Sequence, residues 1–230
     1  MSIIVITPTR GRPAKAAESY EAFLKTRQDP ASAMVFVVDK DDPDWDAYVA
    51  VKVPVVTYDH EGGGMGPPMN AAAADYAASG EHSIVGFIGD DHRFRSLGWD
   101  VAIGRALENG GMAYGNDLAR QDIPTAVFIS SDIVRALGWF CLPGAKHLYL
   151  DNTWAQVGRE AGCLMYLPDV IIEHAHPFFG RGQMDEHYAR VNHPSMYAHD
   201  EKVYREWNMS GQAQRDIETV RGVMTSAKEA

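Results

Sequence analysis

Two adjacent carboxylates, Asp90 and Asp91, follow directly after an apolar run at residues 84–88. The run predicts a buried strand, and α/β proteins bind their ligands beside the carboxyl ends of such strands. Because neighbouring carboxylates repel each other, the pair favours a divalent cation, with a pyrophosphate supplying further oxygen ligands. The alternative is a solvated turn in which the two acidic residues have no ligand.

Two histidines, His174 and His176, follow a second strand-like run at residues 164–173. In an extended segment the side chains of residues i and i+2 project from the same face, so the two imidazoles can bind one cation. Either one could instead be a buried histidine whose nitrogens are satisfied by neighbouring groups. The sequence therefore predicts a chelating pair and leaves a structural role open for one member.

A tight loop with two arginines is expected after the first strand. Its residues are Thr7, Pro8 and Thr9, followed by Arg10 and Arg12. Proline and glycine in this loop favour a turn, and a guanidinium can form paired hydrogen bonds with phosphate oxygens. The same composition would also serve a strand-to-helix turn for purely local reasons.

Three further polar residues lie at expected ends of strands or starts of helices. Asp39 ends the second predicted strand, and its carboxylate can accept hydrogen bonds from hydroxyl groups or from an imide N–H. Asn70 lies near the start of an alanine-rich helix behind a glycine-rich loop, and a helix N-terminus favours anions. Asp151 directly precedes another predicted helix, where it could also serve only as an N-cap.

Short apolar runs alternate with helix-like stretches, which predicts an α/β fold with a mostly parallel central sheet flanked by helices. The expected strands are residues 3–7, 34–39, 53–58, 84–88, 112–114, 126–130 and 164–173, and the expected helices are residues 13–26, 67–79, 96–109, 131–137 and 152–162. Continuous hydrophobicity in the first two strands suits burial on both faces. We expect one catalytic domain at residues 1–182 and a polar helical extension at residues 183–230.

The composition is that of an ordinary globular protein with an excess of acidic residues. In 230 residues, 31 Asp and Glu face 21 Lys and Arg, and the net charge is −10. This charge repels a phosphate backbone and counts against tight nonspecific binding of nucleic acid. The two cysteines, Cys141 and Cys163, lack metal-site spacing and favour a reducing compartment. Since no signal sequence or bilayer-length apolar run is evident, we expect a cytoplasmic protein with no membrane partner.

In their order along the chain, these motifs resemble those of the GT-A glycosyltransferases, especially the inverting family 2 group. The similarity extends over residues 3–177. The family has an Asp-x-Asp metal motif after its fourth strand, where this chain has Gly89-Asp90-Asp91. The resemblance implies a GT-A (Rossmann-like) fold. It also implies transfer of a sugar, with inversion, from a nucleotide-diphosphate sugar, above all a UDP-sugar, to an acceptor hydroxyl.

The same resemblance implies a role for each candidate residue. Asp91, His174 and His176 would bind Mn²⁺ or Mg²⁺, and Asp151 would be the base that deprotonates the acceptor. Contacts with the nucleotide-sugar donor would come from Thr7, Pro8, Thr9, Arg10, Asp39, Asn70 and Asp90, the last through the ribose or through water. The Gly89–His92 motif with the later histidine pair is also similar to small glycosyltransferase-like proteins of bacterial viruses, which would place the chain in a host cytoplasm.

Two other classes of protein stay open. A sugar nucleotidyltransferase would share the sheet order, and the segment from Arg10 to Lys15 partly matches its Arg-x-x-Pro-Lys-like signal. Its first loop, however, is normally longer and richer in glycine. A non-catalytic metal- or sugar-binding module of the same fold is the other class. Within the preferred class the acceptor could be a protein, a glycan, a small molecule or a modified DNA base, and the sequence leaves the oligomeric state open.

Overall fold

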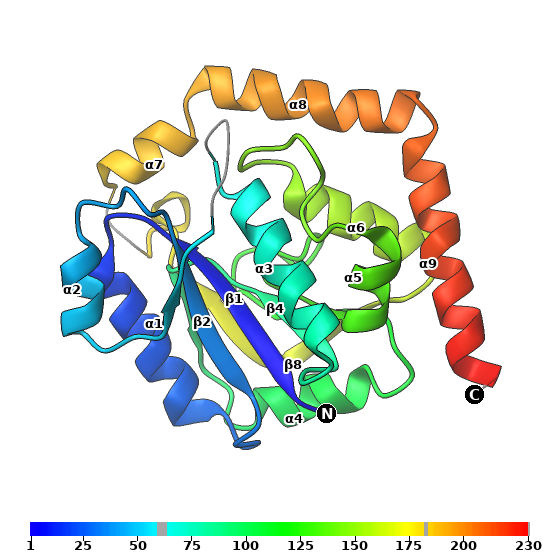
Figure 1. The fold of residues 1–230 in the computed structure, drawn as a ribbon, viewed down its shortest axis with the longest axis horizontal. Helices are drawn as coiled ribbons and strands as arrows, with labels where there is room; N and C mark the ends of the chain where they lie inside the picture. The colour runs from blue at the N-terminus through cyan, green and yellow to red at the C-terminus, as the bar shows by residue number, and fades with distance from the viewer. Residues whose placement is uncertain (59–63, 182–183, 230) are drawn as a thin grey trace.

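The computed structural model describes residues 1–58, 64–181 and 184–229 (Figure 1). The strands are β1 (Ile3–Thr9), β2 (Ala33–Val38), β3 (Val55–Val56), β4 (Ile84–Phe87), β5 (His92–Phe94), β6 (Met112–Asn116), β7 (Val127–Ser130) and β8 (Leu164–His174). The helices are α1 (Pro13–Thr26), α2 (Trp45–Ala50), α3 (Gly66–Ser79), α4 (Trp99–Ala106), α5 (Ser131–Leu137), α6 (Leu150–Glu160), α7 (Glu186–Val191), α8 (Pro194–Met209) and α9 (Gln212–Glu229), with the 3-10 turn η1 at Pro177–Phe179.

The strands form one mixed sheet in the order β3-β2-β1-β4-β7-β6-β8-β5. Strand β1 is parallel to both β2 and β4, whereas β7 is antiparallel to β4 and to β6. The predicted mixed, mostly parallel sheet is thus confirmed. After β1 the chain builds outward to β2 and β3 and then returns to β4 on the other side of β1. This reversal leaves a crevice at the carboxyl ends of β1 and β4, where ligands of α/β proteins bind.

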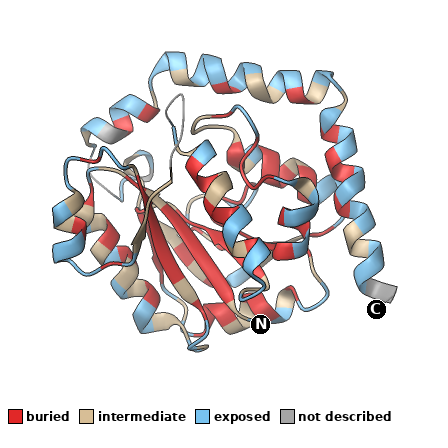
Figure 2. Cartoon of the chain, viewed as in Figure 1, coloured by how far each residue is buried: buried red, intermediate tan, exposed pale blue. Residues whose placement is uncertain are grey.

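Helices cover both faces of the sheet, because the side chains of β1 alternate between two cores. Ile3 and Val5 belong to the core that includes residues of α1 and α4, and Ile4 and Ile6 to the core that includes residues of α3 and α5. All four side chains are buried, and Figure 2 shows the buried strands in the centre with exposed helix faces outside. Burial on both faces explains why this strand is continuously apolar.

The C-terminal helices α7, α8 and α9 follow the last strand and pass around one side of the molecule (Figure 1). Helix α9 packs against α5, α6 and α8, and its residues Ile217 and Val220 are part of the main core. In α8, the buried indole N–H of Trp207 donates to Asp216 at 2.8 Å. The predicted helical character of this region is confirmed, and its division from the rest at residue 182 stays a prediction.

Several elements differ from the sequence-based expectation, among them β3, which has only the residues Val55–Val56 where a strand at residues 53–58 is expected. Strand β1 continues to Thr9, so Pro8 and Thr9, which lie beyond the expected strand, pair with β2. Helix α4 begins at Trp99 rather than at Ser96, because the Ser96 hydroxyl donates to the Asp169 carbonyl at 2.9 Å and accepts the N–H of Ile171 at 2.8 Å. Helix α2 and strand β5 are not predicted at all, since each is too short to show a hydrophobic period.

Among the described helices, none combines the length and the apolar character needed to cross a bilayer.

Gly115 offers a test of the packing between β6 and β8. It lies where β6 shifts register against β8, and a Cβ atom there would overlap the carbonyl oxygen of Val170. Because backbone cannot yield cheaply, Gly115→Ala should lower the free energy of unfolding by about 1–3 kcal/mol in urea denaturation. The control Gly222→Ala lies in α9, where a Cβ meets nothing described within 4 Å, and should instead stabilise the helix slightly. Unchanged stability of Gly115→Ala would contradict the close approach.

Candidate functional site

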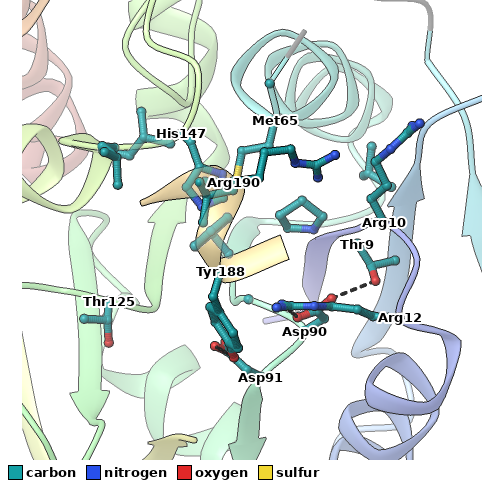
Figure 3. A pocket seen from close by; sticks show the side chains of 18 of the residues that line it. Thr9, Arg10, Arg12, Met65, Asp90, Asp91, Thr125, His147, Tyr188 and Arg190 are labelled. Carbon is teal, nitrogen blue, oxygen red and sulfur yellow. Dashed lines mark hydrogen bonds and ion pairs between the residues drawn. The ribbon is translucent and has the colours of Figure 1, made fainter. Parts of the chain in front are cut away.

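A cavity of about 550 Å³ opens at the carboxyl ends of β1, β2 and β4 (Figure 3). Its size is in the range of small-molecule sites. Further walls come from the segment before α6, the end of β8, and helices α7 and α8. The lining includes the predicted site residues Pro8, Thr9, Arg10, Asp39, Asp90, Asp91, Asp151, His174 and His176. The fold therefore brings residues from distant motifs together in one place.

Two of the predicted donor contacts, Thr7 and Asn70, do not line this cavity. Thr7 is fully buried within β1. Asn70 uses its side chain on a neighbouring segment: its Oδ1 accepts the N–H groups of Phe140 and Cys141 at 2.8 and 2.7 Å, and its Nδ2 donates to the Cys141 carbonyl at 2.9 Å. Asn70 thus holds the segment that leads into the cavity wall, and direct donor contact by either residue stays a prediction.

Asp90 joins the end of β4 to the end of β1. Its Oδ2 accepts the Thr9 hydroxyl at 2.8 Å and its Oδ1 accepts Nη1 of Arg12 at 3.1 Å (Figure 3). Asp90 and Arg12 are only 5% and 8% exposed. Burial raises the pKa of Asp90 to about 6, although Arg12 favours the carboxylate form. Both oxygens of Asp90 are therefore bound by the protein itself.

Asp91, His92 and His174 each offer one ligand atom, and these atoms lie within 4.8 Å of one another. Asp91 Oδ1 is 3.2 Å from His92 Nδ1, and Oδ2 is 3.4 Å from His174 Nε2. Ligand atoms about 2.1 Å from one cation are separated by roughly 3 Å, and carboxylate and imidazole both bind divalent metals. The donor set and its spacing fit a divalent cation.

Strand pairing places the two imidazoles. In the antiparallel pair of β5 and β8, His92 lies directly opposite His174, and the rings stack with centroids 4.1 Å apart. The sequence-based ligand set contains His176 where this group has His92. His176 also lines the cavity, but its Nδ1 accepts the N–H of Phe178 at 3.2 Å, and its role as a ligand stays a prediction. His92 directly follows the acidic pair, and that adjacency was its only signal in the sequence.

Hydrogen bonds orient the His92 ring. Its Nε2 lies 3.5 Å from the Thr125 hydroxyl, which donates to Asp117 at 2.7 Å, and its Nδ1 accepts the N–H of Gly89 at 3.1 Å. Burial lowers the pKa of His92, which favours the neutral ring. The proton then belongs on Nε2, and the single lone pair of Nδ1 accepts the Gly89 N–H. A cation bound between Asp91 and His92 would have to take this lone pair from Gly89.

Helix α7 closes the cavity on one side through Tyr188. The Tyr188 hydroxyl donates to Asp91 Oδ2 at 2.7 Å, as Figure 3 shows, and its ring lies 4.1 Å below the Arg12 guanidinium. Asp185, the N-cap of α7, accepts Nη2 of Arg12 at 2.5 Å and Nζ of Lys15 at 3.1 Å. No recognisable motif surrounds Tyr188 or Asp185 in the sequence, so neither was predicted.

The two neighbouring histidines favour the charged form of Asp91. Burial alone would raise its pKa, but His174 and His92 hold the pKa well below the usual range of an aspartate. Burial, together with Asp91, raises the pKa of Tyr188, so the phenol keeps its proton and stays a donor. The site therefore holds a carboxylate whose negative charge is retained inside the protein.

Arg10 and Asp39 form the opposite rim, at the ends of β1 and β2. Nη1 of Arg10 donates to Asp39 at 2.8 Å and to Asp41 at 2.6 Å. The hydrogen bond with Asp41 raises the pKa of Arg10, burial opposes this, and Asp39 adds to the rise. A phosphate bound by Arg10 would have to share the guanidinium with these carboxylates.

Asp151 lies in the first turn of α6 and lines the cavity. The N-cap position belongs to Tyr149, which forms no side-chain capping bond, so Asp151 is not the N-cap that the sequence left as an alternative. Burial raises the pKa of Asp151. A half-buried carboxylate with a raised pKa at the edge of a cavity is suited to accept a proton.

No protein-family model matches the sequence, and no curated protein is significantly similar to it. Solved structures do match. The mannosyltransferase PcManGT from Pyrobaculum calidifontis, in complex with GDP-Man and Mn²⁺, aligns with a TM-score of 0.59 and 13% identity over 99% of this chain and 75% of its own. TarS from S. aureus, in complex with UDP-GlcNAc, aligns with a TM-score of 0.55 and 14% identity over 100% of this chain and 92% of its own.

Glucosyl-3-phosphoglycerate synthase from Mycobacterium tuberculosis, in complex with Mn²⁺ and UDP-Glc, aligns with a TM-score of 0.59 and 10% identity over 88% of this chain and 78% of its own. In a longer TarS structure the alignment spans only 36% of that protein. These similarities show that the chain has a GT-A-like fold. None of the three proteins comes from a virus, so the similarity to proteins of bacterial viruses finds no support among them.

The Tyr188 hydroxyl allows a test of the cation site. A hydrogen bond that orients a ligand carboxylate strengthens metal binding, so Tyr188→Phe should weaken Mn²⁺ binding at least about tenfold in isothermal titration calorimetry. Tyr197→Phe is the control, because the Tyr197 hydroxyl donates to Asn192 instead of to Asp91. Equal or tighter binding by Tyr188→Phe would mean that the hydroxyl competes with the cation for Asp91.

Proposed function

We propose that the protein is a metal-dependent glycosyltransferase that moves a sugar from a nucleotide-diphosphate sugar to an acceptor hydroxyl. The observation that carries this proposal is the convergence of Asp91, His92, His174 and Asp151 on one cavity at the carboxyl edge of a GT-A-like sheet. A UDP-sugar is the preferred donor, since TarS and the synthase were solved with UDP-GlcNAc and UDP-Glc, although PcManGT was solved with GDP-Man.

Asp91, His92 and His174 would hold the cation. Mg²⁺ prefers oxygen ligands, whereas imidazole nitrogen suits transition metals, so this ligand set favours Mn²⁺ over Mg²⁺. When bound, the cation would neutralise negative charge on the departing diphosphate. His176 lies beside these three residues, since its ring centroid is 5.2 Å from that of His174. We propose that His176 contacts the diphosphate of the nucleotide-sugar donor.

The residues of the chain divide the remaining work. Asp151 is proposed to accept the proton of the acceptor hydroxyl as that oxygen attacks the anomeric carbon from the face opposite the diphosphate, which inverts the configuration. Arg12 supplies positive charge beside Asp90 and Asp185, and Lys15 supplies it beside Asp185. Because Thr9 and Arg12 already bind both oxygens of Asp90, contact of Asp90 with the ribose would run most simply through water.

We propose residues 1–182 as the catalytic domain and residues 183–230 as an extension that completes the cavity. Arg190, Asn192 and Met196 of the extension line the cavity, which supports a share in substrate binding. The cysteines Cys141 and Cys163 are both buried and free, in keeping with the cytoplasmic location that we propose.

Removal of the cation or of its carboxylate ligand tests the first part of this proposal. Chelation should abolish donor turnover, and Asp91→Asn should weaken Mn²⁺-dependent binding of a nucleoside diphosphate at least about tenfold in a thermal-shift titration. The control Asp46→Asn removes an equal charge from an exposed position on α2. A nucleoside diphosphate as product supports sugar transfer, whereas release of pyrophosphate from a nucleoside triphosphate would identify a nucleotidyltransferase.

The pH dependence of turnover tests Asp151 as the base. Only the carboxylate form can accept the proton, so kcat/KM should fall as the pH drops through the raised pKa of Asp151. The acid limb is therefore expected above the range of an ordinary aspartate. Asp151→Asn should bind donor normally, lose at least about 100-fold in kcat, and show no such limb. Full activity in this variant would remove the base assignment.

A further inference from the structure

A buried carboxylate in helix α8 holds the segment that precedes Asp151. Asp200 is 0% exposed. Its Oδ1 accepts the backbone N–H of Lys146 at 2.9 Å, and its Oδ2 accepts those of His147 and Leu148 at 2.8 and 2.7 Å. The neighbouring His199 ring adds a contact from Nδ1 to Oδ1 at 2.7 Å. Three consecutive backbone groups thus share one negative charge that comes from more than 50 residues away in the chain.

The same segment is also bonded on its other side. The carbonyl oxygen of Lys146 accepts the N–H of Met65 at 2.8 Å, at the start of α3. One peptide unit is therefore held between α8 and α3, and His147 and Leu148 beyond it line the cavity. Burial lowers the pKa of His147 to about 4, so this part of the wall is uncharged.

Tyr149 connects the anchored segment, residues 146–148, to the start of helix α6. Its φ of 62° is in the left-handed region, which is unfavourable for a non-glycine residue and persists only when the surroundings impose it. Its ring stacks on Tyr204 of α8 with centroids 5.5 Å apart, and its carbonyl accepts the N–H and the hydroxyl of Thr153 at 3.0 and 2.8 Å. Helix α6 then begins at Leu150, with Asp151 in its first turn.

We infer that Asp200 is a positioning residue that sets the place of Asp151 in the cavity through residues 146–149. The inference rests on the proposed function where it treats Asp151 as the base. Helix α8 runs along the top of the molecule in Figure 1, and its residue Met196 lines the cavity. The Asp200 contact therefore makes the C-terminal extension a determinant of the reaction geometry. Asp200 itself is not among the residues that line the cavity, and its partners are backbone N–H groups and the His199 ring.

The test is the near-isosteric substitution Asp200→Asn. An amide has only one oxygen, and its NH₂ group would face at least one of the three backbone donors, leaving it without an acceptor. A displacement of about 1 Å can cost on the order of 100-fold in rate, so we expect kcat to fall about 10- to 100-fold. The KM for donor and the Mn²⁺-dependent affinity for a nucleoside diphosphate should stay within about twofold, because Asp91, His92 and His174 are untouched.

A matched control separates positioning from loss of stability. Asp216 is likewise buried, and it accepts Trp207 Nε1 and Gln212 Nε2, both at 2.8 Å, without contacting residues 146–149. Asp216→Asn should lower the unfolding midpoint but leave kcat as in the unchanged protein. A similar drop in kcat in both variants would show that Asp200 acts only through general stability and would overturn the inference.

Hydrogen exchange tests whether Asp200 anchors residues 146–148 and does not depend on measured turnover. The amides of residues 146–148 should exchange faster in Asp200→Asn than in Asp216→Asn, and a crystal structure of the first variant should show a displaced Asp151. If the unchanged protein transfers no sugar from any donor, the proposed function fails, and these two measurements still test the anchoring. Unaltered exchange with Asp151 in place would overturn the inference, whatever the activity.

Discussion

Two neighbouring carboxylates are buried at the end of one strand, and the rest of the site is arranged around the cost of keeping them there. Asp90 and Asp91 are 5% and 8% exposed, and burial of a charge costs several kcal/mol unless partners compensate. The protein compensates each one differently. Asp90 is bound by Thr9 and Arg12, whereas Asp91 faces two imidazoles and a phenol. Both carboxylates line the cavity, but of the two only Asp91 belongs to the group whose atoms could bind a cation.

This division explains why distant parts of the chain have to meet at the crevice between β1 and β4. The segment between β1 and α1 supplies the Arg12 guanidinium that binds Asp90. The pairing of β5 with β8 brings two imidazoles to Asp91, and α7 supplies the Tyr188 hydroxyl that also binds Asp91. Asp185 then neutralises the positive charge that Arg12 and Lys15 bring, so the contacts form a closed network. The C-terminal helices are consequently part of the electrostatic balance of the site.

Much of the fold was predictable because its signals are local. Helices α1 and α5 have the predicted bounds, since Pro13 opens the first and Gly138, with a φ of 71°, ends the second. The location of the acidic pair followed from the apolar strand before it. The part played by His92 depends on the pairing of β5 with β8 across some 80 residues, and no local pattern encodes such pairing. Tyr188 and Asp200 lie in polar helices, where a functional residue looks like any solvent-facing one.

The two edges of the sheet are formed by β3, with two residues, and β5, with three. An exposed edge strand presents unpaired backbone groups that can recruit another chain, and proteins limit this hazard by keeping such strands very short. Strand β1 lies inside the sheet, and its residues 4–6 pair with β2 on one side and with β4 on the other. In β8, residues 164–167 and 171 pair with β6, and residues 172–174 pair with β5. The apolar strand β1 therefore presents no open edge to another chain, and the strands at the two borders of the sheet are short.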